Sequence, residues 1–124
     1  MGPYLMAMIL VCICDACLKT TVGTGGSRNR GIAFGLLKRT PARVVLLHGI
    51  TIMGVGIGAY VTGREYLWAV VIGGLANLGD RVVGGAVTDY IEVRVGAHRF
   101  PSFNLADVVV VVNIALWCTA TMST

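Results

Sequence analysis

The chain has 124 residues, of which 56% are hydrophobic and 13% are charged, and its mean hydropathy is +0.79. Soluble domains have about 25% charged residues, so this composition excludes an ordinary soluble domain and indicates helices that pack inside lipid. The net charge of +4 lies mostly between apolar runs; without interleaved aromatic residues it favours lipid headgroups or an acidic or lipidated partner over nucleic acid.

Four apolar segments are candidates for membrane-spanning helices, at residues 3–18, 44–61, 66–88 and 105–122. A spanning helix needs about 20 residues, within a range of roughly 17 to 25, so the last three segments qualify and the first is marginal. The first segment lacks the basic start and the small-residue cleavage site of a cleaved signal peptide, and we expect it to remain as a helix. The sequence thus predicts an all-α integral membrane protein with four transmembrane helices, in a single membrane-embedded domain over residues 1–124.

The connections between these segments are short and polar. A glycine-rich loop covers residues 19–30, a tight turn covers residues 62–65, and a third loop covers residues 92–102. A short amphipathic segment at residues 32–39 stops before Pro41. We expect this segment to be an interfacial helix with its apolar side on lipid; the alternative is a plain linker.

The few acidic residues are expected to converge. There are six of them: Asp15, Glu65, Asp80, Asp89, Glu92 and Asp107. If successive helices alternate in direction, the end of the first, the end of the third and the start of the fourth meet at one membrane face, which brings Asp15, Asp89 and Asp107 together. Glu65 would lie at the other face. Acids at membrane depth are costly enough to indicate function.

The third apolar segment carries a polar group of its own. Asn77, Asp80 and Arg81 are spaced to share one helical face, where Asp80 and Arg81 can neutralise each other. Asp80 and Asp89 are separated by about 900° of helical rotation, so in an unbroken helix they would face opposite ways. Either the two acids have different roles, or the helix bends at residues 84–85.

The fourth segment begins with a capping pattern. Asn104 is a candidate N-cap, and Asp107 would then occupy the third helical position, where the helix dipole favours an ionised carboxylate. Asp89, expected near a helix C-terminus, would be disfavoured as an ion. Aspartic proteases use two such carboxylates, which share one proton. Our hypothesis is that Asp107 activates water as the base while protonated Asp89 polarises the scissile carbonyl, the pair titrating jointly.

Four sequence blocks carry a resemblance to a known family. They are "DACLK" at residues 15–19, "NRGIAFGLL" at 29–37, "ANLGDRVVGGAVTDYI" at 76–91 and "FPSFNLADV" at 100–108. Each block is weak alone, but the four in this order closely resemble bacterial signal peptidase II, the lipoprotein signal peptidase. The resemblance implies an aspartic endopeptidase that removes the signal peptide from diacylglyceryl-modified prolipoproteins.

The resemblance also implies site residues and partners. The catalytic pair would be Asp89 and Asp107. The supporting positions would be Asp15, Asn29, Asn77, Asp80, Arg81, Asn104 and Ala106. We expect no cofactor, no metal ion and no nucleic-acid partner. The expected partners are the prolipoprotein substrate and membrane lipids, and the expected state is a monomer.

Two arguments disagree about orientation. Cytoplasmic loops usually carry the excess of Lys and Arg, and the face with the acids holds most of these residues whereas the opposite face holds only Arg64. The resemblance implies the reverse: an active site near the extracytoplasmic face of the bacterial cytoplasmic (inner) membrane, with a small extracytoplasmic loop region. We follow the resemblance, because ordered motifs are more specific than a charge bias.

Two other functions remain open. A small proton-coupled membrane transporter would need an acid near the bilayer midplane and internal symmetry, but here the acids lie at helix ends and no repeat is present. A catalytically impaired relative that only binds prolipoproteins is the other. It is suggested by the connection between Asp15 and Asn29, which is shorter than the family's sheet-like cradle and has little strand content beyond residues 20–22.

Overall fold

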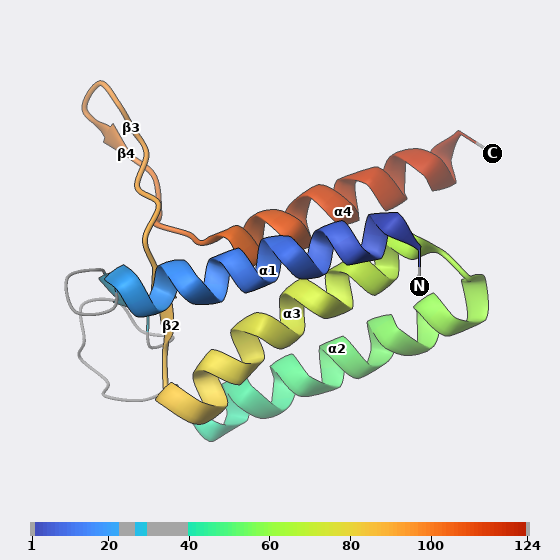
Figure 1. The fold of residues 1–124 in the computed structure, drawn as a ribbon, viewed down its shortest axis with the longest axis horizontal. Coiled ribbons are helices and arrows are strands. Elements are labelled where there is room, and N and C mark those ends of the chain that lie inside the picture. Colours follow the sequence, from blue (N-terminus) through green and yellow to red (C-terminus); the bar gives the residue numbers. More distant parts are fainter. Residues whose placement is uncertain (1, 23–26, 30–39, 124) are drawn as a thin grey trace.

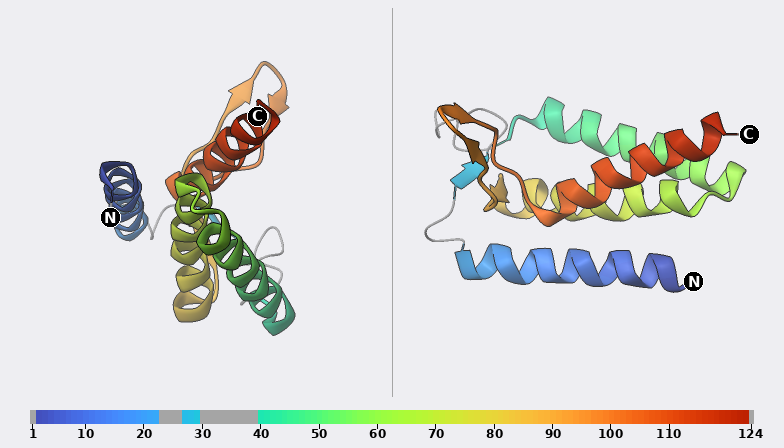
Figure 2. Two further views of the ribbon diagram at one scale, coloured as in Figure 1. Left: turned by 90° about the vertical axis from the view of Figure 1, so that its right-hand side faces the viewer. Right: turned by 90° about the horizontal axis from the view of Figure 1, so that it is seen from above.

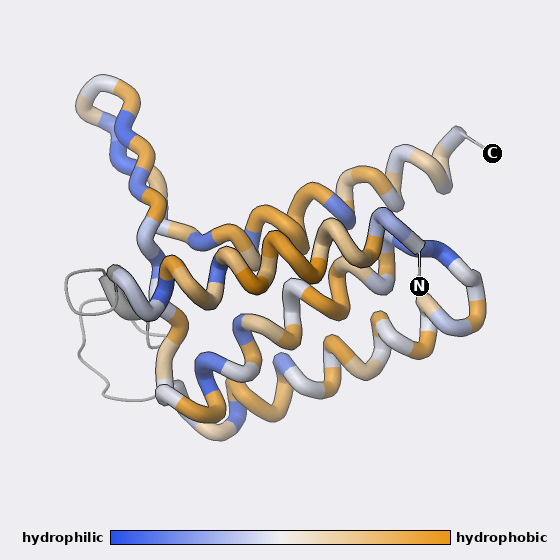
Figure 3. The backbone as a smooth tube through the Cα atoms, viewed as in Figure 1, coloured by the Kyte–Doolittle hydropathy of each residue, from blue (hydrophilic) through white to orange (hydrophobic). Residues whose placement is uncertain are grey.

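Four long helices form the protein. The structure, a computed structural model, describes residues 2–22, 27–29 and 40–123. The helices are α1 (Pro3–Val22), α2 (Ala42–Thr62), α3 (Glu65–Gly84) and α4 (Leu105–Met122). Each is long and apolar enough to cross a membrane. Figure 3 shows hydrophobic residues along all four, with hydrophilic residues gathered at the end of the bundle that carries the strands and in the turn between α2 and α3. The predicted all-α integral membrane fold is confirmed.

Helix α3 is the centre of the bundle. It packs against each of the other three helices, and α1 also contacts α4 (Figures 1 and 2). Adjacent glycines allow this close approach. A Cβ atom on Gly73 would lie 2.9 Å from the carbonyl oxygen of Ala106 on α4, and one on Gly74 would lie 3.1 Å from the Ile52 side chain on α2. Small residues at such contacts let helices pack without a hydrophobic driving force between them.

Short strands lie at one end of the bundle. Strand β1 (Ser27–Asn29) pairs antiparallel with β2 (Val87–Asp89), and Ser27 is opposite Asp89. Strands β3 (Arg94–Val95) and β4 (His98–Arg99) form a hairpin that leaves the bundle sideways (Figure 1). The backbones of Ile91 and Phe103 pair at the base of this hairpin.

The third helix ends earlier than predicted, which corrects the placement of Asp89. The helix stops at Gly84 because Gly85 adopts a left-handed conformation, with φ 78° and ψ −4°, which glycine tolerates without steric cost. The amide and the hydroxyl of Thr40 both donate to the Gly85 carbonyl, at 2.6 and 2.9 Å. The chain then runs as an extended strand, so Asp89 lies in β2 and not at a helix C-terminus.

Other expected boundaries also shift. The first helix extends to Val22 instead of residue 18, so residues 20–22, expected as the only strand content of the short connection, are helical. The strand of that connection is β1. The fourth helix has its expected bounds. The predicted interfacial helix at residues 32–39 lies outside the described residues.

The close contact at Gly73 generates a test of the packing. Gly73→Leu would push a side chain into the Ala106 carbonyl and separate α3 from α4, so we expect the free energy of unfolding to fall by about 1–3 kcal/mol or more. Gly54→Leu is the matched control, because a Cβ atom at Gly54 meets nothing within 4 Å. Thermal unfolding of both variants in detergent measures the difference. Equal stability of the two variants would contradict this account of the interface.

Candidate active site

The ends of α1 and α3, strand β2 and the start of α4 lie at one end of the bundle (Figure 1), and polar side chains from these four elements contact one another there. Asp15 of α1, Asp89 of β2 and Asn104 before α4 are 1%, 4% and 0% exposed. Asn77 of α3 is also buried. The expected convergence is present: Asp89 and Asp107 share Asn104 as a partner, and Asp15 accepts from the backbone amide of the next residue, Leu105.

Asn104 connects the two candidate catalytic carboxylates. Its side-chain oxygen accepts from the backbone amide of Asp107 at 2.9 Å, and its own backbone amide donates to Asp107 Oδ2 at 3.1 Å. This is the capping box expected from the sequence. The side-chain amide of Asn104 lies 3.2 Å from Asp89 Oδ1. One asparagine thus contacts both acids while it starts α4.

Asn77 fixes the other side of Asp107. Its amide group donates to Asp107 Oδ1 at 2.7 Å, and its oxygen accepts from the Asn104 amide at 3.1 Å. The two oxygens of Asp107 are therefore held by Asn77 and by the backbone of Asn104. These donors fix the orientation of the half-buried Asp107 carboxylate.

Asp15 anchors α1 to the start of α4. Its Oδ1 accepts from the Tyr90 hydroxyl at 2.6 Å and from the Leu105 backbone amide at 3.0 Å. The Leu105 amide is one of the unpaired donors of the first turn of α4, and a carboxylate there is favoured by the helix dipole. Asp15 therefore acts on the position of α4 without touching Asp89 or Asp107 in the contacts described.

Lys19 is a site residue that the sequence reasoning missed. Its ammonium group lies 2.5 Å from Asp15 Oδ2 and 2.5 Å from Asp80 Oδ2, and it donates to Asn77 Oδ1 at 3.3 Å. Its side chain is only 8% exposed. The spacing of Asp15 and Lys19, four residues apart on a helix, was a signal that could have found this pair.

The expected pairing of Asp80 with Arg81 is wrong. Asp80 pairs with Lys19 instead, because α1 packs against the same face of α3. Arg81 points to α2, where its Nη1 lies 3.2 Å from Nδ1 of His48. Asp80 and Arg81 thus join α3 to different neighbouring helices.

Two predicted site residues remain, one with its side chain described and one with only its backbone described. Ala106 is fully buried at the contact between α3 and α4, beside Gly73. Asn29 is described only by its backbone, which pairs with Val87, two residues before Asp89 in β2.

An open cavity of about 650 Å³ adjoins the site between α1, α3 and β2. Its lining includes Lys19, Asp80, Gly84 and Ala86, and it reaches Thr88, which precedes Asp89. The cavity thus occupies the space between two membrane helices, and its lining ends at Thr88, one residue before the candidate carboxylate Asp89 in the sequence. Among residues 2–22, 27–29 and 40–123, no three His, Cys, Asp or Glu side chains are grouped so that they could hold a metal ion.

Comparison with known proteins agrees with this architecture. The profile of the family described as Signal peptidase (SPase) II matches residues 7–123. The chain belongs to the signal peptidase II family. A lipoprotein signal peptidase of Sulfurihydrogenibium sp. (strain YO3AOP1) is 33% identical over 101 residues, which are 72% of this chain and 62% of that protein. One of Burkholderia cenocepacia (strain HI2424) is 36% identical over 99 residues, 71% of this chain and 58% of that protein. The chain spans about three fifths of the length of these relatives.

Solved structures share the fold. A bacterial membrane enzyme determined by the in meso method at 2.3 Å resolution has a TM-score of 0.77, and the match covers 97% of this chain and 88% of that one. A second, at 1.9 Å resolution, has a TM-score of 0.76 and covers 95% and 92%. Both are 21% identical to this chain, so they establish the four-helix membrane architecture as a shared fold.

The Lys19 cluster generates a stability prediction. Lys19→Met would leave Asp15 and Asp80 facing each other without their shared cation, and removing one partner of a buried pair costs about 3–5 kcal/mol. The double variant Lys19→Met/Asp80→Asn should lose less than the sum of the two single variants, because the lysine and the aspartate interact. Chemical unfolding in detergent gives the four stabilities of this cycle. Strictly additive losses would contradict the ion pair.

Tyr90 generates a pH prediction. Burial and, next, the hydrogen bond to Asp15 raise the pKa of Tyr90 above its usual 10.0, so the fold stabilises the neutral phenol. That contribution is complete below the unfolded pKa of about 10 and is lost as the pH rises through the higher folded pKa. We expect Tyr90→Phe to lower the free energy of unfolding by about 1–2 kcal/mol at neutral pH, with a smaller loss in strong alkali. The free energies of unfolding of the wild type and of Tyr90→Phe, measured at neutral pH and in strong alkali, test this prediction. A difference between the two proteins that is the same at both pH values would contradict it.

Proposed function

We propose that this protein is an aspartic endopeptidase that removes the signal peptide from diacylglyceryl-modified prolipoproteins. Membership of the signal peptidase II family supports the reaction. The observation that supports the aspartic mechanism is the contact of Asn104 with both Asp89 and Asp107. Two carboxylates held by one side chain are suited to sharing a proton, as in other aspartic proteases.

In the proposed mechanism Asp107 is the base. Its oxygens are held by donors from Asn77 and Asn104, and it takes a proton from the attacking water. Asp89 carries the proton that polarises the scissile carbonyl. Water adds to that carbonyl to form a tetrahedral intermediate, and a proton passed to the departing amine completes the cleavage. Asn77 and Asn104 are positioning residues in this scheme, because they hold the carboxylates and do not exchange protons.

The position of the pair suits a substrate with a lipid at its cleavage site. The acids lie at the end of membrane-spanning helices, where a lipid-anchored peptide can arrive sideways and water can arrive from the aqueous side. The cavity beside Thr88 provides space for the peptide between α1 and α3. We place the protein in the bacterial cytoplasmic membrane as a monomer, with this end of the bundle at the extracytoplasmic face.

Cleavage of a diacylglyceryl-modified prolipoprotein by the purified protein tests the proposal. The readout is the mobility shift of the product on a gel. We expect Asp89→Asn and Asp107→Asn each to lower the rate by roughly 10³-fold or more, since each removes a group that moves a proton. Glu65→Gln is the matched control: Glu65 begins α3 at the opposite end of the bundle, so this variant should cleave at the wild-type rate.

Two outcomes would overturn the proposal. If the folded wild-type protein binds the precursor but leaves it uncut, the protein is a prolipoprotein-binding relative and not a peptidase. If either asparagine variant cleaves at the wild-type rate while it remains folded, the chemistry does not use these two carboxylates.

A further inference from the structure

The hairpin formed by β3 and β4 stands away from the rest of the protein. Figures 1 and 2 show it leaving the strand-bearing end of the bundle sideways, with its tip clear of all four helices. Every residue from 92 to 101 is exposed. Gly96, with φ 60°, makes the turn. The backbone pairing of Ile91 with Phe103 closes the base and fixes the hairpin to the segment that enters α4.

One face of the hairpin is apolar. The pairing sets Val95 opposite His98, and the Phe100 amide donates to the Val93 carbonyl at 3.1 Å. Because side chains two residues apart share a face, these four lie together, and the rings of His98 and Phe100 meet edge to face at 4.8 Å. Val95 is 64% exposed and Phe100 is 45% exposed. We call this set the apolar face.

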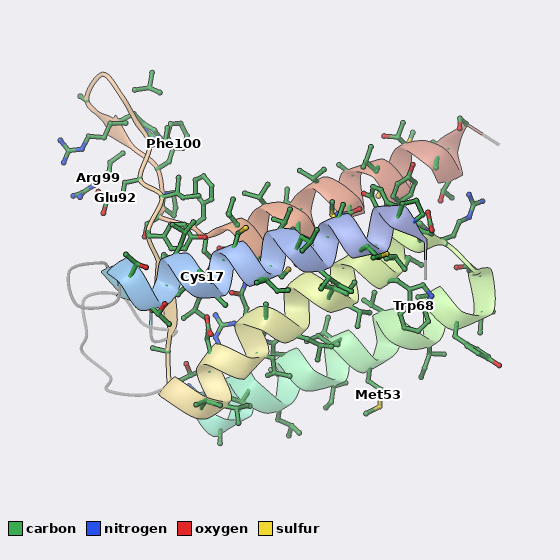
Figure 4. All side chains as sticks on the ribbon, in the orientation of Figure 1. Cys17, Met53, Trp68, Glu92, Arg99 and Phe100 are labelled. Atoms are coloured by element: carbon green, nitrogen blue, oxygen red, sulfur yellow. The ribbon has the colours of Figure 1, made fainter. Side chains whose placement is uncertain are left out.

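The opposite face is cationic. Arg94 and Arg99 stand directly opposite each other in the register, an arrangement of like charges that is unfavourable unless an anion lies between or beside them. Glu92 lies 3.6 Å from Arg99, and both side chains are largely exposed. The ion pairs among the described residues include none for Arg94. Figure 4 shows Phe100 on one side of the hairpin, with Arg99 and Glu92 on the other.

A hairpin with one apolar and one cationic face is unlike an element that is surrounded only by water. A two-stranded ribbon is at best marginally stable by itself, and here Val95 and Phe100 on its apolar face remain exposed. An element with one apolar and one basic face is instead typical of a segment that lies in a membrane interface, with its apolar side inserted among the acyl chains and headgroups. The base of the hairpin, at Ile91 and Phe103, adjoins the start of α4, which is long and apolar enough to cross a membrane.

We infer that the hairpin at residues 92–101 is a membrane-surface anchor that binds anionic phospholipid headgroups through Arg94 and Arg99. The apolar face enters the boundary between headgroups and acyl chains. The two guanidinium groups then reach lipid phosphates, which they match as bidentate donors. The lipid phosphate also supplies negative charge beside Arg94, whereas Arg99 already has Glu92. This inference is independent of the proposed peptidase activity, since it concerns the bilayer and not the substrate.

A tryptophan on the apolar face tests the inference. Val95→Trp is made in a chain whose two tryptophans are replaced, Trp68→Phe and Trp117→Phe. The protein is placed in vesicles that contain lipids brominated near the headgroup end of the acyl chain. We expect the fluorescence of the new tryptophan to be quenched in vesicles with anionic lipid, and the aqueous quencher acrylamide to be about twofold less effective there than in detergent.

Charge variants separate headgroup binding from simple insertion. In Arg94→Gln/Arg99→Gln the fraction of anionic lipid needed for half-maximal quenching should rise about fivefold or more, because each arginine near an anionic surface adds to the attraction. Arg64→Gln is the matched control: Arg64 is exposed in the turn at the other end of the bundle, and its loss should leave this titration unchanged.

Three results would overturn the inference. Full access of acrylamide with no quenching by brominated lipid would place the hairpin in water, where it would serve a soluble partner. Equal quenching in zwitterionic and anionic vesicles would leave no role for the arginines. An equal shift in Arg64→Gln would mean that overall charge, and not the hairpin, sets the response.

Discussion

A carboxylate that leaves water must keep its hydrogen bonds and its charge balance, and the polar end of this bundle is arranged around that requirement. Asp15 and Asp89 are almost fully buried among apolar helices. Asp15 is satisfied by a lysine, a tyrosine and the first turn of α4, and each of those partners comes from a different position along the chain. If the helices moved apart at this end, the Asp15 carboxylate would be exposed to lipid or would lose its hydrogen-bond and ion-pair partners.

Asn104 shows how one residue can satisfy several of these demands. As the N-cap it pairs with a donor of the first turn of α4 and sets where the helix begins. As an amide it also faces Asp89 and Asn77. An aspartate at the same position could cap the helix but would place a third carboxyl group against Asp89 and Asp107. The side chain must be neutral, and it must both donate and accept, which leaves few alternatives to asparagine.

The features that could be predicted from sequence are those with a local cause. Helix α4 and its cap follow from an apolar run that begins after Asn104, and the four spanning segments follow from length and hydropathy. The sequence left the end of α3 open between an unbroken helix and a bend at residues 84–85, because a glycine pair is equally consistent with close packing. In the structure the left-handed Gly85 ends the helix, and its carbonyl accepts from Thr40, which is distant in the chain. The partner of Asp80 was misassigned for the same reason, since the choice between Lys19 and Arg81 depends on how α1 packs on α3. Strands of two or three residues carry no periodic signal that could have been recognised.

The order of these elements along the chain has a consequence for biosynthesis. Lys19 and Asp80 are translated before Asn104, and Asp89 is translated before Asp107, so the polar cluster is assembled from its sides and closed by the last helix. Until α4 has inserted, Asp15 lacks the Leu105 amide and Asp89 lacks the Asn104 amide that they contact in the finished fold. A partly synthesised chain thus holds only one half of the carboxylate pair. If that pair cleaves peptides, the nascent protein is inactive until α4 is in the membrane, and up to that point no separate inhibitor is needed to protect neighbouring chains.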